Sequence, residues 1–187
     1  MEDTKILAFC GSLRKDSYNK KLLLHTCDIL KEENCDVTYL DLKSLALPIY
    51  DSDFEEASGL PEGANRLITA MHSADAILIA SPEYNGCISG ALKNAIDWAS
   101  RAEKNPFPEK IFMLIGTSPG HWGATKSLLH ARLILNHLRA VVIPSQLALP
   151  YAEKSMDTSG TPTDPSQQKM LKNACLELIH FVKSFKN

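Results

Sequence analysis

Five short apolar runs alternate along this chain with longer segments of helical periodicity, and this alternation constrains the fold more than any other feature. The strand-sized apolar runs occupy residues 4–10, 36–42, 76–80, 110–116 and, brokenly, 141–149. Helical spacing of apolar residues is found over 17–33, 62–73, 89–101, 123–139 and 166–185. Alternation of this kind is typical of a parallel sheet with helices on both faces.

We therefore predict a flavodoxin-like three-layer α/β sandwich, with a five-stranded parallel sheet in the order 2-1-3-4-5. The length of 187 residues suits one hydrophobic core, so we expect residues 1–187 to form a single domain. Residues 45–63 and 151–165 lack clear periodicity and are expected to be irregular surface connections. In this strand order the switch point lies between strands one and three, where open sheets bind their ligands.

The segment after the first strand, residues 11–19, is dense in hydrogen-bond donors. Backbone N–H groups at the start of the following helix attract a phosphate. Ser12, Ser17 and Asn19 add neutral donors, and Arg14 adds a charged, planar fork. The pattern predicts a phosphate-binding loop. The alternative is that Ser17 or Asn19 only caps the helix while Arg14 is solvated.

The segment after the third strand is suited to presenting backbone polar groups. Pro82 keeps the residue before it extended, and Asn85-Gly86 favours a turn with positive φ. Backbone groups around Glu83 match the hydrogen-bonding edge of an isoalloxazine ring, and Tyr84 is placed to flank such a ring. The alternative is an ordinary strand-to-helix turn. Because this loop and the phosphate loop follow adjacent strands, we predict flavin mononucleotide (FMN) as the ligand.

Composition and charge argue against several other partners. A net charge of −2 provides no global field for nucleic acid or an anionic membrane, and no apolar stretch is long enough to span a bilayer. The first residues lack the pattern of a secretory signal. The five scattered cysteines include no CxxC pair, which predicts free thiols in a reducing cytoplasm.

Two further patterns bear on phosphate or metal binding. Residues 120–127 approach a Walker A motif, but Thr125 stands where the second glycine is required, so no P-loop is predicted. His130 and His137 share a helix face but lack a third ligand with matching spacing, so no metal site is predicted. Glu83 has no apparent partner carboxylate for general acid chemistry.

The two loops together resemble a known family. Gly-Ser-x-Arg-x-x-Ser-x-Asn after the first strand, with Pro-Glu-Tyr-Asn-Gly-x-x-x-Gly-x-Leu-Lys-Asn-Ala-Ile-Asp-Trp over 82–98, resembles the NADPH-dependent FMN reductases, and the resemblance covers nearly the whole chain. Loop 116–123 is similar to the glycine-rich loop of that family, although His121 and Trp122 are bulkier than expected there. The implied contacts are Ser12, Arg14, Ser17 and Asn19 for the phosphate, Pro82, Glu83, Tyr84 and Asn85 for the isoalloxazine, and Ser118 from the third loop.

The resemblance implies an FMN-dependent oxidoreductase. NADPH or NADH would pass a hydride to N5 of bound FMN, and a quinone, chromate, azo dye, ferric complex or flavin would then accept electrons at the same place by a ping-pong mechanism. No side chain is assigned as catalytic, because the cofactor carries the chemistry. A homodimer or homotetramer is also implied, with the site completed by a neighbouring subunit. The alternatives are a flavodoxin-type electron carrier and a regulatory module that binds a flavin or nucleotide without turnover.

Overall fold

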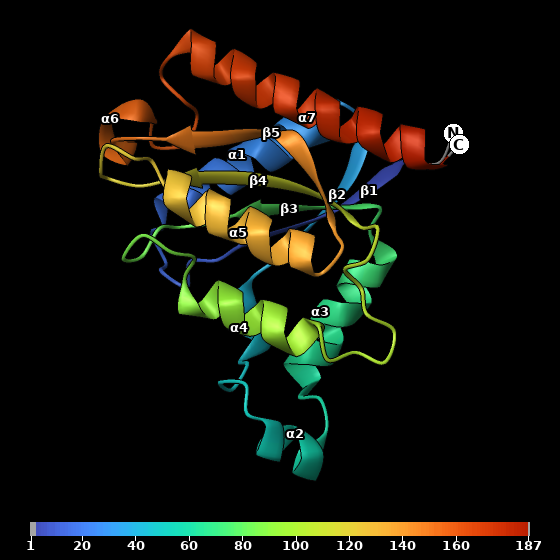
Figure 1. Cartoon of the computed structure of the whole chain (residues 1–187). Helices are drawn as coiled ribbons and strands as arrows, with labels where there is room; N and C mark the ends of the chain where they lie inside the picture. The colour runs from blue at the N-terminus through green and yellow to red at the C-terminus, as the bar shows by residue number, and fades with distance from the viewer. Residues whose placement is uncertain (1–2, 187) are drawn as a thin grey trace.

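A parallel sheet of five strands organises the chain in the computed structural model, which describes residues 3–186 (Figure 1). The order is β2-β1-β3-β4-β5, and every neighbouring pair is parallel. The predicted fold class and strand order are thereby confirmed. The strands are β1 (Thr4–Cys10), β2 (Cys35–Leu40), β3 (Ala76–Ala80), β4 (Ile111–Thr117) and β5 (Val141–Leu149).

Helices cover both faces of this sheet (Figure 1). One face carries α1 (Tyr18–Glu32) and α7 (Pro165–Lys186). The opposite face carries α3 (Glu62–Ser73), α4 (Gly90–Ala99) and α5 (Thr125–His137). None of the described helices is both long and apolar enough to cross a membrane.

Two apolar cores result because successive strand residues point to opposite faces. On β1, Ile6 and Ala8 belong to the core beneath α1 and α7, whereas Leu7 and Phe9 belong to the core beneath α3, α4 and α5. The central strands are therefore buried on both faces, which explains why they read as continuous apolar runs.

Three short helices lie where the sequence analysis expected strand or irregular chain. The apolar pattern predicts a second strand that reaches residue 42. In the structure β2 ends at Leu40, and the Asp41 side chain caps a new helix by accepting the Lys43 N–H at 3.0 Å. Helices this short carry too little apolar periodicity to be recognised. They are the 3₁₀ helix η1 (Leu42–Leu45), α2 (Ser52–Ser58) and α6 (Ala152–Ser155).

A bulge interrupts β5, in agreement with its broken apolar run. The register pairs Phe112 with Val142 but Leu114 with Gln146. Arg132 of α5 stabilises the irregular segment, because its guanidinium donates to the carbonyl oxygen of Val142 at 3.2 Å. Partial burial lowers the pKa of Arg132.

Candidate cofactor-binding site

The loops that follow β1, β3 and β4 meet in one cleft of about 60 Å³ at the carboxyl ends of these strands. It includes every predicted site residue except Asn85. A second hollow, of about 320 Å³, adjoins it and shares Arg14 and Tyr84. The residues that line the first cleft are Ser12, Arg14, Ser17, Tyr18, Asn19, Pro82, Glu83, Tyr84, Thr117, Ser118 and Pro119.

The turn after β1 is held against the start of α4. Gly11 donates its N–H to the Ala80 carbonyl at 2.9 Å, and the Ser89 hydroxyl donates to the Gly11 carbonyl at 2.5 Å. A Cβ at Gly11 would lie 3.0 Å from the Cβ of Leu92. This contact would be tighter than ordinary van der Waals packing, so the close approach of the loop to α4 favours glycine.

Asn19 joins the phosphate loop to the end of β4. Its Oδ1 accepts the N–H of Thr117 at 2.9 Å, and its Nδ2 donates to the Thr117 carbonyl at 2.8 Å. The Asn19 side chain is buried, with 5% of the residue exposed. The carboxamide thus acts toward Thr117 as a neighbouring peptide group would, a role that the residue pattern of the loop does not indicate.

The two serines of the phosphate loop make weaker local contacts. Ser17 is the N-cap of α1, and its Oγ accepts the N–H of Lys20 at 3.3 Å. Ser17 therefore caps α1, and its contact with a phosphate stays a prediction. Ser12 Oγ accepts the N–H of Arg14 at 3.4 Å and lies 3.4 Å from the Tyr84 hydroxyl, which links the first loop to the second.

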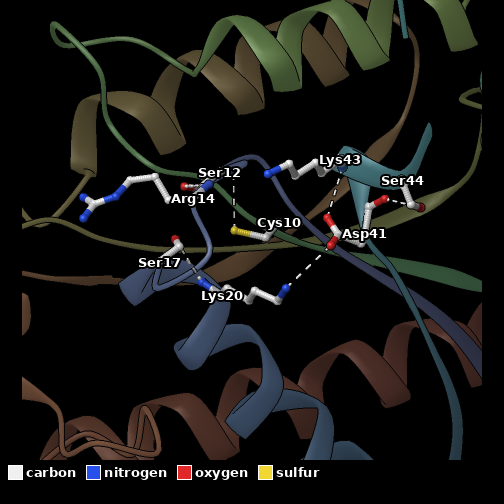
Figure 2. A network of polar contacts seen from close by, with 8 residues as sticks. All are labelled: Cys10, Ser12, Arg14, Ser17, Lys20, Asp41, Lys43 and Ser44. Atoms are coloured by element: carbon white, nitrogen blue, oxygen red, sulfur yellow. Dashed lines mark hydrogen bonds and ion pairs between the residues drawn. The ribbon is translucent and has the colours of Figure 1, made fainter. Parts of the chain in front are cut away.

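Arg14 supplies a free cation at the edge of the cleft. Figure 2 shows its side chain extending away from the contact between Ser12 and Cys10. Within residues 3–186 its guanidinium makes no hydrogen bond or ion pair. An unpaired guanidinium beside the start of α1 suits a phosphate.

A second cation, Lys20, is already engaged behind the loop. Its Nζ lies 3.6 Å from an Asp41 carboxylate oxygen (Figure 2) and 5.5 Å from the centroid of the Tyr39 ring. Cys10 lies beneath the loop and accepts the Ser12 N–H on Sγ at 3.4 Å. Burial raises the pKa of the Cys10 thiol to about 11, so this thiol is neutral at ordinary pH.

The loop after β3 contains the turn predicted at Asn85-Gly86. Asn85 has φ 52° and Gly86 has φ 75°. Tyr84 and Cys87 exchange backbone hydrogen bonds of 3.0 and 3.1 Å, which closes a two-residue turn of the type that positive φ permits. The Tyr84 side chain is 47% exposed, so its ring is available to a ligand.

Glu83 serves the start of α5. Its Oε2 accepts the N–H groups of Lys126 and Ser127 at 3.0 and 3.3 Å, where the positive end of the helix dipole favours a carboxylate. The Ser127 hydroxyl donates to the Pro82 carbonyl at 2.9 Å and lies 2.6 Å from the Ser81 hydroxyl. Sequence reasoning missed Ser127, since its partners lie on a loop more than forty residues away.

The loop after β4 is fixed by backbone contacts. Ser118 donates its N–H to the Leu149 carbonyl at 3.3 Å and accepts the Ala152 N–H at 3.0 Å. Gly123 has φ 56°, and a Cβ there would lie 2.4 Å from the nitrogen of Pro150, so no larger residue fits. Ser118 therefore faces the cleft from a well-defined backbone. Within residues 3–186, no three His, Cys, Asp or Glu side chains gather as a metal site would require.

The donor set fits a phosphorylated ring compound. Arg14 and the first residues of α1 line the cleft, together with Pro82, Glu83 and Tyr84, which lead into the turn after β3. The adjoining hollow offers the apolar surface of Leu13 and Ala91. On a sheet with its switch point at this place, these features define the class of flavin-type mononucleotide-binding α/β proteins.

Comparison with known proteins identifies the family. The model of the NADPH-dependent FMN reductase family matches residues 4–154, and the chain belongs to this family. An NAD(P)H-dependent FMN reductase of Pseudomonas aeruginosa is 31% identical over 183 residues, 97% of each chain. A quinone reductase of Escherichia coli is 34% identical over 143 residues, 76% of this chain and 74% of the relative.

A solved structure agrees with these relatives. FerB, an NAD(P)H:acceptor oxidoreductase from Paracoccus denitrificans, has a TM-score of 0.82 and 30% identity, covering 97% of this chain and 98% of its own. The predicted class is confirmed: the protein is an oxidoreductase that uses FMN, with NAD(P)H as electron donor.

Proposed function

We propose that this chain, as one FMN-binding domain, holds FMN in the cleft and transfers electrons from NAD(P)H to a small-molecule acceptor by a ping-pong mechanism. The observation that carries the proposal is one cleft lined by Arg14, whose guanidinium has no partner within residues 3–186, by the start of α1, and by Pro82, Glu83 and Tyr84. Bound FMN would supply hydride and electron transfer, which no side chain of the chain can provide.

Different side chains would bind the two ends of the cofactor. Arg14 would neutralise the phosphate, helped by the hydroxyl of Ser12 and the N-terminus of α1. Asn19 would act mainly by holding Thr117 in place, while its second amide hydrogen remains for a ligand. The residues that we propose to hold FMN are Ser12, Arg14, Ser17, Asn19, Pro82, Glu83, Tyr84, Asn85 and Ser118.

No side chain is proposed as a proton donor. Glu83 already accepts two backbone N–H groups of α5, so its carboxylate is engaged at the start of that helix. Burial keeps Cys10 protonated. The chain's own contribution is to bind and orient the cofactor and donor, and to leave one face of the ring open to solvent.

A quinone is the acceptor class that we propose first. Relatives are named as a quinone reductase in Escherichia coli and a 2-hydroxy-1,4-benzoquinone reductase in Burkholderia sp.. Chromate, azo dyes, ferric complexes and free flavin fit the same open site and are to be tested beside it. The names of these relatives describe catalysed reductions, which favours an enzyme over a flavodoxin-type electron carrier.

We further propose a homodimer or homotetramer that functions in the cytoplasm. Ile49 is 82% exposed and Leu13 is 44% exposed, and both line a hollow beside α4 next to the site. Apolar side chains exposed together in this way suit a protein interface. Sedimentation of the holoprotein distinguishes a monomer from these assemblies.

Steady-state kinetics tests the mechanism. The purified protein should show flavin absorbance that bleaches on anaerobic addition of NADPH and returns with a quinone. Double-reciprocal plots at several quinone concentrations should be parallel, because a nicotinamide stacked within about 3–3.5 Å of the ring leaves no room for a second ring. Intersecting lines would require separate donor and acceptor pockets and would overturn the single shared site.

A further inference from the structure

An exposed indole stands beside the loop that follows β4. Trp122 is 60% exposed, whereas Trp98, the other tryptophan, is fully buried and donates from Nε1 to the Pro48 carbonyl at 2.8 Å. A tryptophan held largely in solvent leaves a large aromatic face available for stacking.

The loop that carries Trp122 is fixed rather than loose. The Trp122 carbonyl accepts the N–H of Thr125 at 2.9 Å and its hydroxyl at 2.6 Å. His121 approaches the Tyr151 hydroxyl at 3.1 Å through Nδ1, and Tyr151 donates its N–H to the Gly120 carbonyl at 3.1 Å. Hydrogen bonds on both sides of Trp122 along the chain therefore hold the backbone that carries the indole.

A lysine lies between this indole and the loop that follows β3. Lys126 Nζ is 5.8 Å from the centroid of the Trp122 ring, and its Cδ would be 3.5 Å from a Cβ placed on Gly86. The Lys126 backbone is set by the Glu83 carboxylate, which accepts its N–H. Within residues 3–186, Nζ of Lys126 forms no salt bridge, so its charge remains available.

We propose that Trp122 and Lys126 bind the adenosine 2′-phosphate part of NADPH. This inference rests on the proposed function, in which NAD(P)H binds over FMN in the cleft. From there the donor would cross the turn at Gly86, where Lys126 lies, and reach the indole. A purine stacks on an aromatic face, and a phosphomonoester pairs with an ammonium group. NADH lacks the 2′-phosphate, so the arrangement favours NADPH.

Tryptophan fluorescence of the holoprotein tests the site without turnover. Adenosine 2′,5′-bisphosphate and adenosine 5′-monophosphate differ only in the 2′-phosphate. Because Trp98 is buried, a ligand-dependent change in emission reports Trp122. The bisphosphate should bind about tenfold more tightly than the monophosphate, and Lys126→Gln should remove this difference. Lys169→Gln, an exposed lysine on α7, is the matched control and should behave as wild type.

Kinetics of the same variants supplies a second readout. Lys126→Gln should lower kcat/KM for NADPH about tenfold, while the value for NADH changes less than about twofold. Trp122→Ala should lower both values. Equal binding of the two nucleotides to the wild type, or an equal loss in the Lys169 control, would overturn the adenosine site. Absence of flavin absorbance in the purified protein would instead count against the proposed function, because absorbance reports FMN itself, whereas the comparison of the two nucleotides reports the adenosine site.

Discussion

Replacing Asn19 by alanine should destabilise the fold through Thr117. The change removes hydrogen bonds of 2.9 and 2.8 Å to the N–H and carbonyl of Thr117, in a place where Asn19 is 5% and Thr117 is 1% exposed. Two such bonds contribute about 1 kcal/mol each, and the abandoned groups of Thr117 add a desolvation cost. Both residues line the cleft, so water can partly replace the amide. We therefore expect a loss of about 2–4 kcal/mol.

Urea denaturation of wild type and variant, followed by circular dichroism at equal FMN concentration, measures this loss. Asn65→Ala is the matched control, because its exposed amide makes one bond of 3.3 Å to the Leu60 carbonyl. The control should lose less than about 1 kcal/mol. An equal loss of unfolding free energy in the two variants would refute the view that the Asn19 carboxamide stabilises the end of β4 through Thr117.

Four further outcomes are expected. Arg14→Ala should weaken FMN binding about 10- to 150-fold and leave riboflavin binding nearly unchanged, and an equal loss for both would remove Arg14 from the phosphate site. Gly86→Val should weaken FMN binding without loss of far-ultraviolet dichroism, because Gly86 has φ 75°; unchanged affinity would show that this turn does not hold the ring. Glu83→Gln should cost about 0.3–1 kcal/mol of unfolding free energy, and a loss that does not shrink in high salt would contradict the helix-dipole account. Burial raises the pKa of the Cys27 and Cys175 thiols from 9.0 to about 12, so these thiols lose their protons at lower pH in the unfolded chain than in the folded one. The free energy of unfolding should therefore fall as pH rises above 9.0. Cys27→Ala should make this fall less steep, and an unchanged slope would refute the assignment of the fall to the buried thiols.

Long-range polar contacts explain where the site differs from its prediction. Asn19 and Thr117 are 98 residues apart in the chain, and Glu83 and Lys126 are 43 apart. The residue types in 11–19 and 82–85 are enough to predict donors and a turn. They do not indicate which donors are already satisfied, because that depends on which loops the sheet brings together.

The sequence by itself determined the sheet and its ligand-binding edge. Short apolar runs such as 76–80 are typical of central parallel strands, and the helical segments between them are typical of crossovers in a sheet of order 2-1-3-4-5. Tertiary structure decided which polar groups are engaged: within residues 3–186 the Arg14 guanidinium makes no hydrogen bond or ion pair, whereas Lys20 pairs with Asp41. Apolar periodicity is a local property that a single segment carries, but hydrogen-bond satisfaction is shared between segments and exists only once they meet.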